Sequence, residues 1–237
     1  MKEFRFDIDE SYMDRFFCPI KNKVQSIELL MNSVKYMVLN PIVQKERIQG
    51  ELVLIVGKMS RLFFLTENKY FSVAFPFIVK YDEAFFFSFK NKMNIDGRLT
   101  SEVISLINDN HFQGGCCIEF AHNIVENQES NGDYYWDFIR ELLFMEDGYL
   151  RCDYDEKNYN KHGRSDMHPL NHYDLFYSGN ATFKLGLEGR IKPSDFIDLL
   201  NINTDCKFIR YLKLPDTPCK LYTIIFCRGA GVLKAIQ

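Results

Sequence analysis

A stretch of short apolar runs between residues 51 and 93 constrains the fold more than any other feature of the sequence. It contains four runs rich in β-branched and aromatic residues, separated by turn residues at 57–58, 66–69 and 81–83. Because the runs are too short for helices and are bounded by turns, they predict an antiparallel meander. The runs are almost continuously apolar, so we expect strands that are covered on both faces, or on one face with the other held in an interface.

The phenylalanines of this meander have two interpretations. We favour the first, in which they form a hydrophobic core, because Phe is among the residue types most often buried. In the second they form an exposed platform for nucleobases, but such platforms interleave aromatic with basic residues. The basic residues of the meander are expected in its turns instead. Pro76 fits best at a sheet edge or a bulge.

An amphipathic helix is expected before the meander. Apolar residues recur at helical spacing from Val24 to Val38, and Pro41 disfavours helix for the residue before it, Asn40. The apolar side of this helix requires a partner surface, and the meander is the nearest candidate. The residues that precede the helix are expected to form a polar arm.

The rest of the chain alternates helical and strand-like segments. We expect helices at 97–110, 133–145 and 192–202, strands at 113–124, 148–155, 168–178, 181–187 and 220–227, and polar loops at 126–133 and 156–166. Thr100 or Ser101 is the expected N-cap of the first of these helices. The strands at 168–178 and 181–187 read as a hairpin with its turn at 178–180.

These elements predict an α+β fold with a mostly antiparallel sheet and a few packed helices. We expect a single domain over residues 1–237, because the last strand needs a sheet to join and the second half alone has few strands. The alternative is a subdivision near residue 130, with a helix and a meander before it and a helix and a hairpin region after it.

The net charge and the cysteines narrow the class of protein. A formal net charge of -3 argues against a protein that coats nucleic acid through a broad basic surface, although a local basic groove is compatible with it. No apolar run is long enough to span a bilayer and the acidic N-terminus is unlike a secretory signal, so we expect a cytoplasmic protein without membrane contact. The 7 cysteines lack zinc-binding spacing and are expected to be reduced and mostly buried.

A charged strand carries the first candidate functional residues. In an extended chain Arg151, Asp153 and Asp155 point to one side, whereas Cys152 and Tyr154 point to the other. Burying three charged side chains on one strand face is costly unless they are paired. The simplest expectation is an Arg151–Asp153 ion pair on a solvated face, and the alternative is a cleft.

Histidines and carboxylates gather around the same strand. Three of the 5 histidines lie between residues 151 and 174, among them His168 and His172. The same segment contains four aspartates and two arginines. Histidine suits proton transfer because its ordinary pKa lies near neutrality, and it is also the commonest metal ligand. With Arg151 and Asp153, the two histidines would supply the acid, base and cation that a metal-free nuclease or phosphodiesterase needs.

The surroundings of the two histidines argue against a shared metal ion. Their spacing of four residues matches helical zinc sites, but Pro169 and the β-leaning residues after it predict loop and strand. On a strand, His168 and His172 would lie about 13 Å apart, too far for one metal unless the chain turns at 169–171. We therefore expect no metal and no cofactor. In the simplest alternative these histidines cap turns or bond to the backbone.

The order of motifs in the second half resembles a known group of proteins. An Arg-x-Asp-Tyr-Asp strand, a variable loop, a His-Pro-x-x-His segment and a hairpin with Lys-x-Gly follow one another within residues 133–200. This order is similar to that of uncharacterised bacterial proteins found in mobile or phage-defence gene clusters. The resemblance implies a cytosolic protein with a role in anti-phage defence, and it implies no established activity.

Three functions are consistent with these features, and the sequence leaves open whether the chain is an enzyme. We favour an accessory or regulatory subunit of a phage-defence or toxin–antitoxin-like system, with another protein subunit as partner and nucleic acid as a further one. The alternative is a metal-independent nuclease or phosphodiesterase with Arg151, Asp153, His168 and His172 as catalytic residues. A third is a nucleotide or small-ligand sensor that uses the same residues. Converging histidines would favour an enzyme, whereas an exposed apolar patch, expected on the meander, would favour a subunit.

Overall fold

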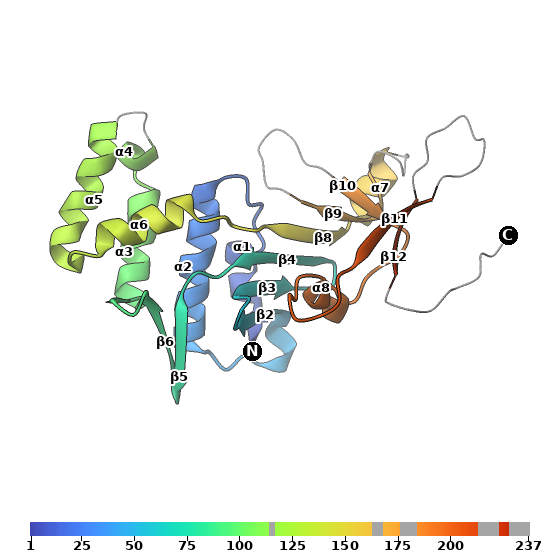
Figure 1. The fold of residues 1–237 in the computed structure, drawn as a ribbon, viewed down its shortest axis with the longest axis horizontal. Helices are drawn as coiled ribbons and strands as arrows, with labels where there is room; N and C mark the ends of the chain where they lie inside the picture. Colours follow the sequence, from blue (N-terminus) through green and yellow to red (C-terminus); the bar gives the residue numbers. More distant parts are fainter. Residues whose placement is uncertain (114–116, 163–167, 176–183, 213–222, 228–237) are drawn as a thin grey trace.

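The computed structural model describes residues 1–113, 117–162, 168–175, 184–212 and 223–227. Over these residues the fold is α+β, as predicted, with eight helices, a seven-stranded sheet and a three-stranded sheet (Figure 1). A further pair of strands forms a separate two-stranded sheet. All neighbouring strands in this part of the chain are antiparallel.

The seven-stranded sheet contains strands from both halves of the chain. Its order is β1 (Lys2–Asp9), β2 (Ile48–Val56), β3 (Arg61–Leu65), β4 (Lys69–Ala74), β8 (Leu150–Tyr154), β9 (Asn171–Asp174) and β10 (Lys184–Leu187). The predicted meander supplies β2, β3 and β4, and the predicted strand and hairpin of the second half supply β8, β9 and β10. The turn expected at 178–180 lies outside the described residues. Pairing of β4 with β8 connects the two halves.

Strand β1 corrects the expectation of a polar N-terminal arm. Phe6 and Ile8 are buried, whereas the charged residues that alternate with them face outward. The strand pairs along its length with β2, and Phe6 lies opposite Leu52. This is the pattern of a strand with one buried face, in a segment whose many charged residues suggested a solvated arm.

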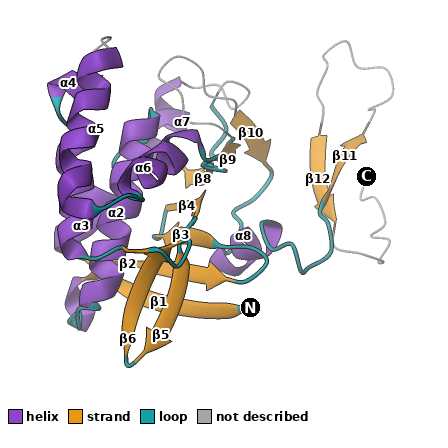
Figure 2. Ribbon diagram, turned by 60° about the vertical axis from the view of Figure 1, so that its left-hand side comes forward, coloured by secondary structure: helices purple, strands orange, loops and turns teal. Residues whose placement is uncertain are grey.

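The central strands are covered on both faces, as their apolar sequence predicts. Leu52 and Phe64 belong to a hydrophobic cluster on one face, and Val53 and Phe63 belong to a second cluster on the other. Helix α2 (Lys23–Leu39) packs on the first face and helix α8 (Pro193–Leu199) on the second (Figure 2). Helix α8 begins at a proline, as predicted, because proline suits the first helical turn.

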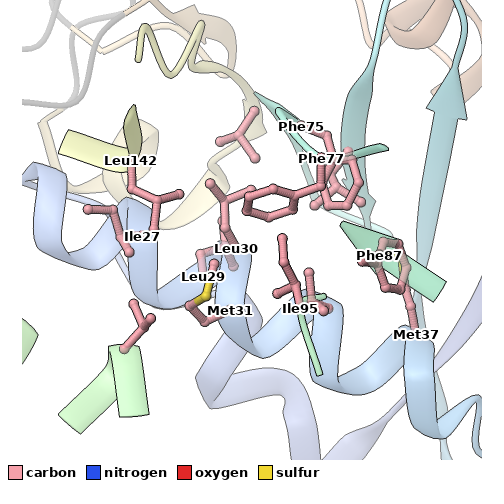
Figure 3. Close-up of a cluster of buried hydrophobic side chains, with 14 of the residues drawn as sticks. Ile27, Leu29, Leu30, Met31, Met37, Phe75, Phe77, Phe87, Ile95 and Leu142 are labelled. Carbon is pink, nitrogen blue, oxygen red and sulfur yellow. The ribbon is translucent and has the colours of Figure 1, made fainter. Parts of the chain in front are cut away.

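Helix α2 is the amphipathic helix expected before the meander. Asn22 caps its start, since its side chain accepts a hydrogen bond from the backbone N–H of Gln25 at 3.0 Å. The helix ends at Asn40, which adopts a left-handed conformation with φ of 40°. Its buried face points at phenylalanines of the two sheets, and Figure 3 shows Leu30 near Phe77.

The meander divides into two sheets at Pro76, which the sequence did not predict. The strands after this proline form the three-stranded sheet, β5 (Ile78–Asp82), β6 (Ala84–Phe89) and β7 (Met93–Asn94). Proline cannot donate a ladder hydrogen bond, which suits a connection between sheets. The turn expected at 81–83 is reduced to Glu83, which has a φ of 58°.

Helices α3 to α6 lie together on one side of the molecule (Figure 2). Their bounds are α3 (Gly97–Ile107), α4 (Asn110–Gln113), α5 (Cys117–Asn131) and α6 (Tyr135–Phe144). Helices α3 and α6 were predicted, but the expected cap of α3 is wrong. Asp96 caps this helix instead of Thr100 or Ser101, because its carboxylate accepts a hydrogen bond from the N–H of Leu99 at 2.8 Å.

Helix α5 overturns two predictions, a strand at 113–124 and a loop at 126–133. The apolar run around Phe120 and Ile124 is short, and short apolar runs do not separate strand from buried helix. The polar residues after this run form the last turns of the same helix, and the turn falls at Gly132, with φ of 87°. Residues 114–116 lie outside the described part of the chain.

Two further expectations need correction. Part of the polar loop expected at 156–166 is helix α7 (Glu156–His162). The last strand, β12 (Thr223–Cys227), pairs with β11 (Phe208–Leu212) and not with the main sheet, so the expectation that it completes that sheet is wrong. Three short segments complete the described structure: η1 (Glu10–Tyr12), α1 (Met13–Phe16) and η2 (Lys45–Arg47).

Two more sequence expectations concern the cysteines and the helices. Cys152 is buried, but Cys18 and Cys206 are exposed, so the expectation of mostly buried thiols is wrong for the cysteines whose side chains are described. None of the described helices has both the length and the apolar composition that crossing a membrane requires.

Candidate functional site

Strands β8, β9 and β10 bring five charged or titratable residues together on one face of the main sheet. Their register places Arg151 beside Asp174 and Asp153 beside His172. Strand β10 adds Lys184, which lies beside Asp174 on the other side. We refer to these five residues as the polar cluster.

The polar cluster continues the sheet face that α2 covers at β1 to β4. Phe71 of β4 lies beside Arg151 in the register and belongs to the hydrophobic cluster on that face. On the opposite face the same strands are apolar, and Cys152 and Tyr173 pack with Phe196 of α8. The period-two alternation therefore separates a charged face from an apolar one, as the sequence predicts for β8.

Arg151 pairs with both aspartates of the cluster. Its Nε lies 2.9 Å from Asp153 Oδ2, and its guanidinium also contacts the carboxylate of Asp174. The predicted Arg151–Asp153 pair is thus confirmed, but the side chains are only 20% and 12% exposed, so the expected solvated face is wrong. Burial opposes the charge of Arg151, yet its pKa is raised because Asp153 and Asp174 stabilise the cation.

His172 is buried in the cluster and held as a neutral base. Its Nδ1 lies 2.8 Å from the carbonyl oxygen of Pro169, which only accepts hydrogen bonds, so Nδ1 carries the proton. Nε2 then accepts a hydrogen bond from the Lys184 ammonium at 2.7 Å. Burial, together with the charge of Lys184, lowers the pKa of His172 below its ordinary value.

His168 belongs to a separate pair beside the cluster. Its Nε2 lies 3.0 Å from Asp155 Oδ2, and Asp155 also accepts a hydrogen bond from the backbone N–H of Asn158 at 3.0 Å, at the start of α7. Partial burial raises the pKa of Asp155, but the hydrogen bonds from Asn158 and His168 outweigh it and lower this pKa to about 2. Asp155 thus lies beyond β8 and not in its charged row.

The chain turns between the two histidines, so they are much closer than strand geometry predicts. Their ring centroids are 5.1 Å apart, whereas an extended chain would hold them about 13 Å apart. The turn is closed by Asp155, whose N–H donates to the carbonyl of Leu170 at 2.9 Å, and by the contact of His172 with the Pro169 carbonyl. The turn therefore brings His168 beside His172, which lies across from Asp153 in the polar cluster.

Gly186 makes room for this turn. It lies opposite His172 in the register, and a Cβ at this position would come within 3.0 Å of Pro169 Cγ. The glycine thus lets Pro169 pack directly over β10, which sets the position of the carbonyl that orients His172.

The residues best placed to hold a cation differ from the two histidines considered in the sequence. Asp153, His172 and Asp174 offer ligand atoms within 4.8 Å of one another. The Lys184 ammonium approaches the same atoms, at 2.7 Å from His172 Nε2 and 3.1 Å from Asp174 Oδ1. A lysine side chain therefore supplies the positive charge at this point of the structure.

Sequence reasoning did not select Asp174 and Lys184, although a signal for them existed. A hairpin whose turn is centred on residue 179 pairs residue 174 with residue 184, and this is the register observed. The predicted turn at 178–180 therefore implied the contact. Arg164 and Asp166, which added to the predicted pool of charges, lie outside the described residues.

The polar cluster is closer to a neutralised ion network than to an open catalytic site. Two cations, Arg151 and Lys184, face two carboxylates, and His172 is fully buried and neutral. Burial raises the pKa of the neighbouring Cys152 to about 12, so this thiol is not activated as a nucleophile. Two buried atoms of the cluster, Asp153 Oδ1 and Arg151 Nε, make no hydrogen bond among the described residues, although Arg151 Nε lies within ion-pair distance of Asp153 Oδ2.

A second candidate site lies on helices α5 and α6. Here an apolar hollow of about 280 Å³, the α5–α6 groove, is lined by Phe120, Ile124, Trp136, Ile139, Leu143 and Phe144, with Arg140 at its border. Phe144, at the end of α6, is 83% exposed. Ile118 and Val125 are also exposed and recur seven residues apart on α5, so they lie on one side of that helix.

The α5–α6 groove is set in the most acidic part of the chain. Residues 117–147 contain eight Asp and Glu residues and a single basic residue, Arg140. Their formal charge of −7 compares with -3 for the whole chain, so the remaining residues are net positive. Three of these carboxylates are already paired, Asp137 with Arg140, Glu141 with Lys90 and the buried Asp147 with Lys23. The acidic residues that remain favour a cationic, amphipathic partner for the apolar groove.

Comparison of the whole chain with protein-family models, with curated proteins and with solved structures finds no match.

Proposed function

We propose that this protein is an accessory subunit that binds a basic amphipathic helix of a partner protein in the α5–α6 groove. The observation that carries this proposal is the apolar hollow between α5 and α6, bordered by the exposed ring of Phe144. An amphipathic helix in a hydrophobic groove is a recurrent mode of peptide recognition, with anchors at positions i, i+3, i+4 and i+7. Contiguous exposed apolar surface of this kind marks binding sites in soluble proteins.

The charge around the groove supports a basic partner over a second copy of this chain. Eight acidic residues against one arginine in residues 117–147 would repel an identical surface, because like charges brought together at an interface are unfavourable. A helix with lysines or arginines on its polar side would meet opposite charge from acidic residues of α5 and α6. Besides this groove on the helices, the meander also exposes apolar side chains, as the sequence predicts, at Ile78, Tyr81 and Phe86.

A synthetic peptide tests this proposal. The probe is a helix-forming peptide with leucines at i, i+3, i+4 and i+7 and lysines elsewhere, and its control has the same composition in an order without an apolar stripe. We expect the amphipathic peptide to bind more tightly, and Phe144→Ala to weaken its binding about tenfold or more, as truncation of an aromatic anchor does. Ile202→Ala, at another exposed apolar residue, should leave the affinity unchanged.

Two results would contradict the proposal. In the first, the two peptides bind equally well, which would mean that charge alone attracts them. In the second, Phe144→Ala binds the amphipathic peptide as tightly as the wild-type protein does.

We further propose, on the resemblance of residues 133–200 alone, that the protein acts in the bacterial cytoplasm within a phage-defence or toxin–antitoxin-like system. If docking in the α5–α6 groove serves that role, Phe144→Ala should remove protection when phage is plated on cells that carry the gene cluster. Ile202→Ala should retain protection. If phage forms plaques equally well on cells with either variant, the groove has no part in defence.

The second candidate function is a metal-independent phosphodiesterase at the polar cluster. It is supported by the approach of His168 to His172, beside Arg151, and by the unpartnered oxygen of Asp153. We expect hydrolysis of an activated phosphodiester in the presence of EDTA, with a loss of about 100-fold or more in His172→Gln, since general acid–base catalysis contributes about that much. His122→Gln, at an exposed histidine of α5, is the control. Absence of hydrolysis by the wild-type protein, or full activity of His172→Gln, excludes this function.

A further inference from the structure

The three-stranded sheet has one buried and one open face. In the register of β5 and β6, Phe85 and Phe87 point into the hydrophobic core, whereas Phe86 points outward and is 53% exposed. An aromatic side chain in the middle of a strand and exposed to this degree is not explained by the core. Lys80 lies directly opposite Phe86 on β5, so a basic residue falls within the strand and not in a turn as the sequence suggested.

A hollow of about 320 Å³ borders this exposed ring. Its lining residues are Lys80, Phe86, Phe87, Ser88, Asn91, Lys92, Met93 and Asn94. The turn between β6 and β7 brings two of these residues to the hollow, because Lys90 and Asn91 have φ values of 51° and 56° and the N–H of Lys92 donates to the Phe89 carbonyl at 2.9 Å. The hollow therefore combines one aromatic face, two ammonium groups and three neutral polar side chains.

The positive charges at this hollow are not neutralised by ion pairs in the described part of the chain. Lys80 makes no ion pair there, and Lys92 instead lies over the ring of Tyr134, 4.5 Å from its centroid. Lys90, by contrast, pairs with Glu141 at 3.1 Å. Asp82 lies two residues from Lys80 on the same face of β5, but it does not line the hollow.

Basic and aromatic side chains therefore alternate along one row. Lys80 faces Phe86 across the strands, Phe86 and Lys92 line the same hollow, and Lys92 lies on Tyr134, which is 40% exposed. Interleaved aromatic and basic residues are the surface that single-stranded nucleic acid requires, because bases stack on the rings and phosphates contact the cations. With two exposed rings and a lysine between them, the row offers stacking positions for more than one base.

We propose that the row Lys80, Phe86, Lys92 and Tyr134 binds single-stranded nucleic acid. One base stacks on Phe86, and Lys80 and Lys92 hold the phosphates on either side of it. The next base takes the place over the Tyr134 ring that Lys92 leaves when it turns to the phosphate. The hollow lies on an open sheet surface, whereas a site for a free nucleotide encloses most of its ligand. This surface and this ligand are separate from the α5–α6 groove and its proposed helix, so neither proposal depends on the other.

Fluorescence anisotropy with a labelled oligothymidylate of about 15 nucleotides tests the assignment. We expect the wild-type chain to bind it and Phe86→Ala to weaken binding about 5- to 100-fold, the range for loss of one stacked base. Phe86→Tyr should restore binding, since it keeps the ring. Lys80→Ala and Lys92→Ala should also weaken binding, whereas Lys58→Ala, at an exposed lysine outside the row, should not.

Three competitor experiments distinguish the alternatives. Unlabelled oligothymidylate should displace the probe, whereas thymidine monophosphate and duplex DNA should displace it poorly. Displacement by the mononucleotide at equal nucleotide concentration would replace the proposal with a small-ligand site. Equal binding by Phe86→Ala and the wild-type protein, with both folded by circular dichroism, would overturn it, as would absence of binding by the wild-type protein.

Discussion

A single hydrogen bond sets the tautomer of His172. Its Nδ1–H donates to the Pro169 carbonyl, so a second proton would have to bind Nε2, where the Lys184 ammonium already lies 2.7 Å away. Charging the imidazole would place two cations in contact inside the protein. The ring therefore stays neutral, and it accepts a hydrogen bond from the lysine that links β9 to β10.

This arrangement predicts a pH dependence of stability. Burial and Lys184 lower the pKa of His172 in the folded state, whereas the unfolded chain binds a proton near the ordinary value of 6.5. Below that value the unfolded state binds more protons, so the stabilisation is complete above it and is lost as the pH falls. We expect the midpoint of thermal unfolding to decrease between about pH 7 and pH 5, and to decrease less in His172→Gln, whose amide can donate and accept in place of the ring.

The matched control for this prediction is His122→Gln, because His122 is exposed on α5. Its pH profile should follow that of the wild-type protein. Asp155 does not contribute to this change, because its pKa is lowered to about 2. The stability that its carboxylate contributes is therefore lost at lower pH than the range measured. An unchanged profile in His172→Gln would show that this histidine is not the group that titrates.

The site residues differ in how far local sequence could reveal them. Arg151 and Asp153 were placed together correctly, because the alternation of a strand needs no knowledge of distant contacts. The approach of His168 to His172 could not be derived, because it depends on a turn held by Asp155 and on the space left by Gly186. Both of those partners lie at least ten residues away in the sequence.

At the scale of elements, the errors share one physical origin. Short apolar runs bury equally well in a strand or on one side of a helix, so the run of α5 was assigned to a strand. The polar residues that follow it were assigned to a loop, although they form the last turns of the same helix. Elements with long periodic patterns, such as α2 and α6, were predicted correctly because several turns of helix repeat the same signal.

The connection from α6 to β8 supplies a prediction at this scale. Gly148 has a φ of 54°, and a Cβ there would lie 2.9 Å from the guanidinium of Arg61, which donates to the Gly148 carbonyl. Gly148→Ala should therefore lower the free energy of unfolding by about 1–2 kcal/mol through backbone strain alone, and by more if Arg61 is displaced. Urea denaturation measures the change.

Gly97→Ala is the control for this substitution. Gly97 begins α3 and has no atoms near its missing Cβ, so alanine should leave stability unchanged or raise it by up to about 1 kcal/mol. Equal stability of the Gly148→Ala and Gly97→Ala variants would mean that the segment between α6 and β8 relaxes without cost.

At the scale of the molecule, the α+β class was predictable and the distribution of strands among sheets was not. The class follows from local patterns, since runs of strands and helices were recognisable one by one. The division at Pro76 and the separate pairing of β11 with β12 depend on contacts between distant segments. Because β4 pairs with β8, strands from before and after residue 130 belong to one sheet. The alternative domain boundary was expected near that residue.

The charge distribution of the whole molecule separates an acidic region from a basic remainder. Residues 117–147 carry a formal charge of −7, so the rest of the chain is net positive although the total is -3. An acidic α5–α6 groove repels nucleic acid, and a cation bound in it removes that repulsion. If both proposed surfaces are correct, a basic helix in the groove and an oligonucleotide on the row of Phe86 should strengthen one another's binding.

This coupling is measurable as a change in oligothymidylate affinity when the amphipathic peptide saturates the groove. At low ionic strength we expect the affinity to rise by about 5-fold or more, a common size for coupling between sites. Near 1 M salt the effect should vanish, because the screening length falls to about 3 Å. Phe144→Ala, which should not hold the peptide, controls for peptide that binds the oligonucleotide directly. A gain that persists in high salt, or that appears equally in Phe144→Ala, would rule out electrostatic coupling through the acidic helices.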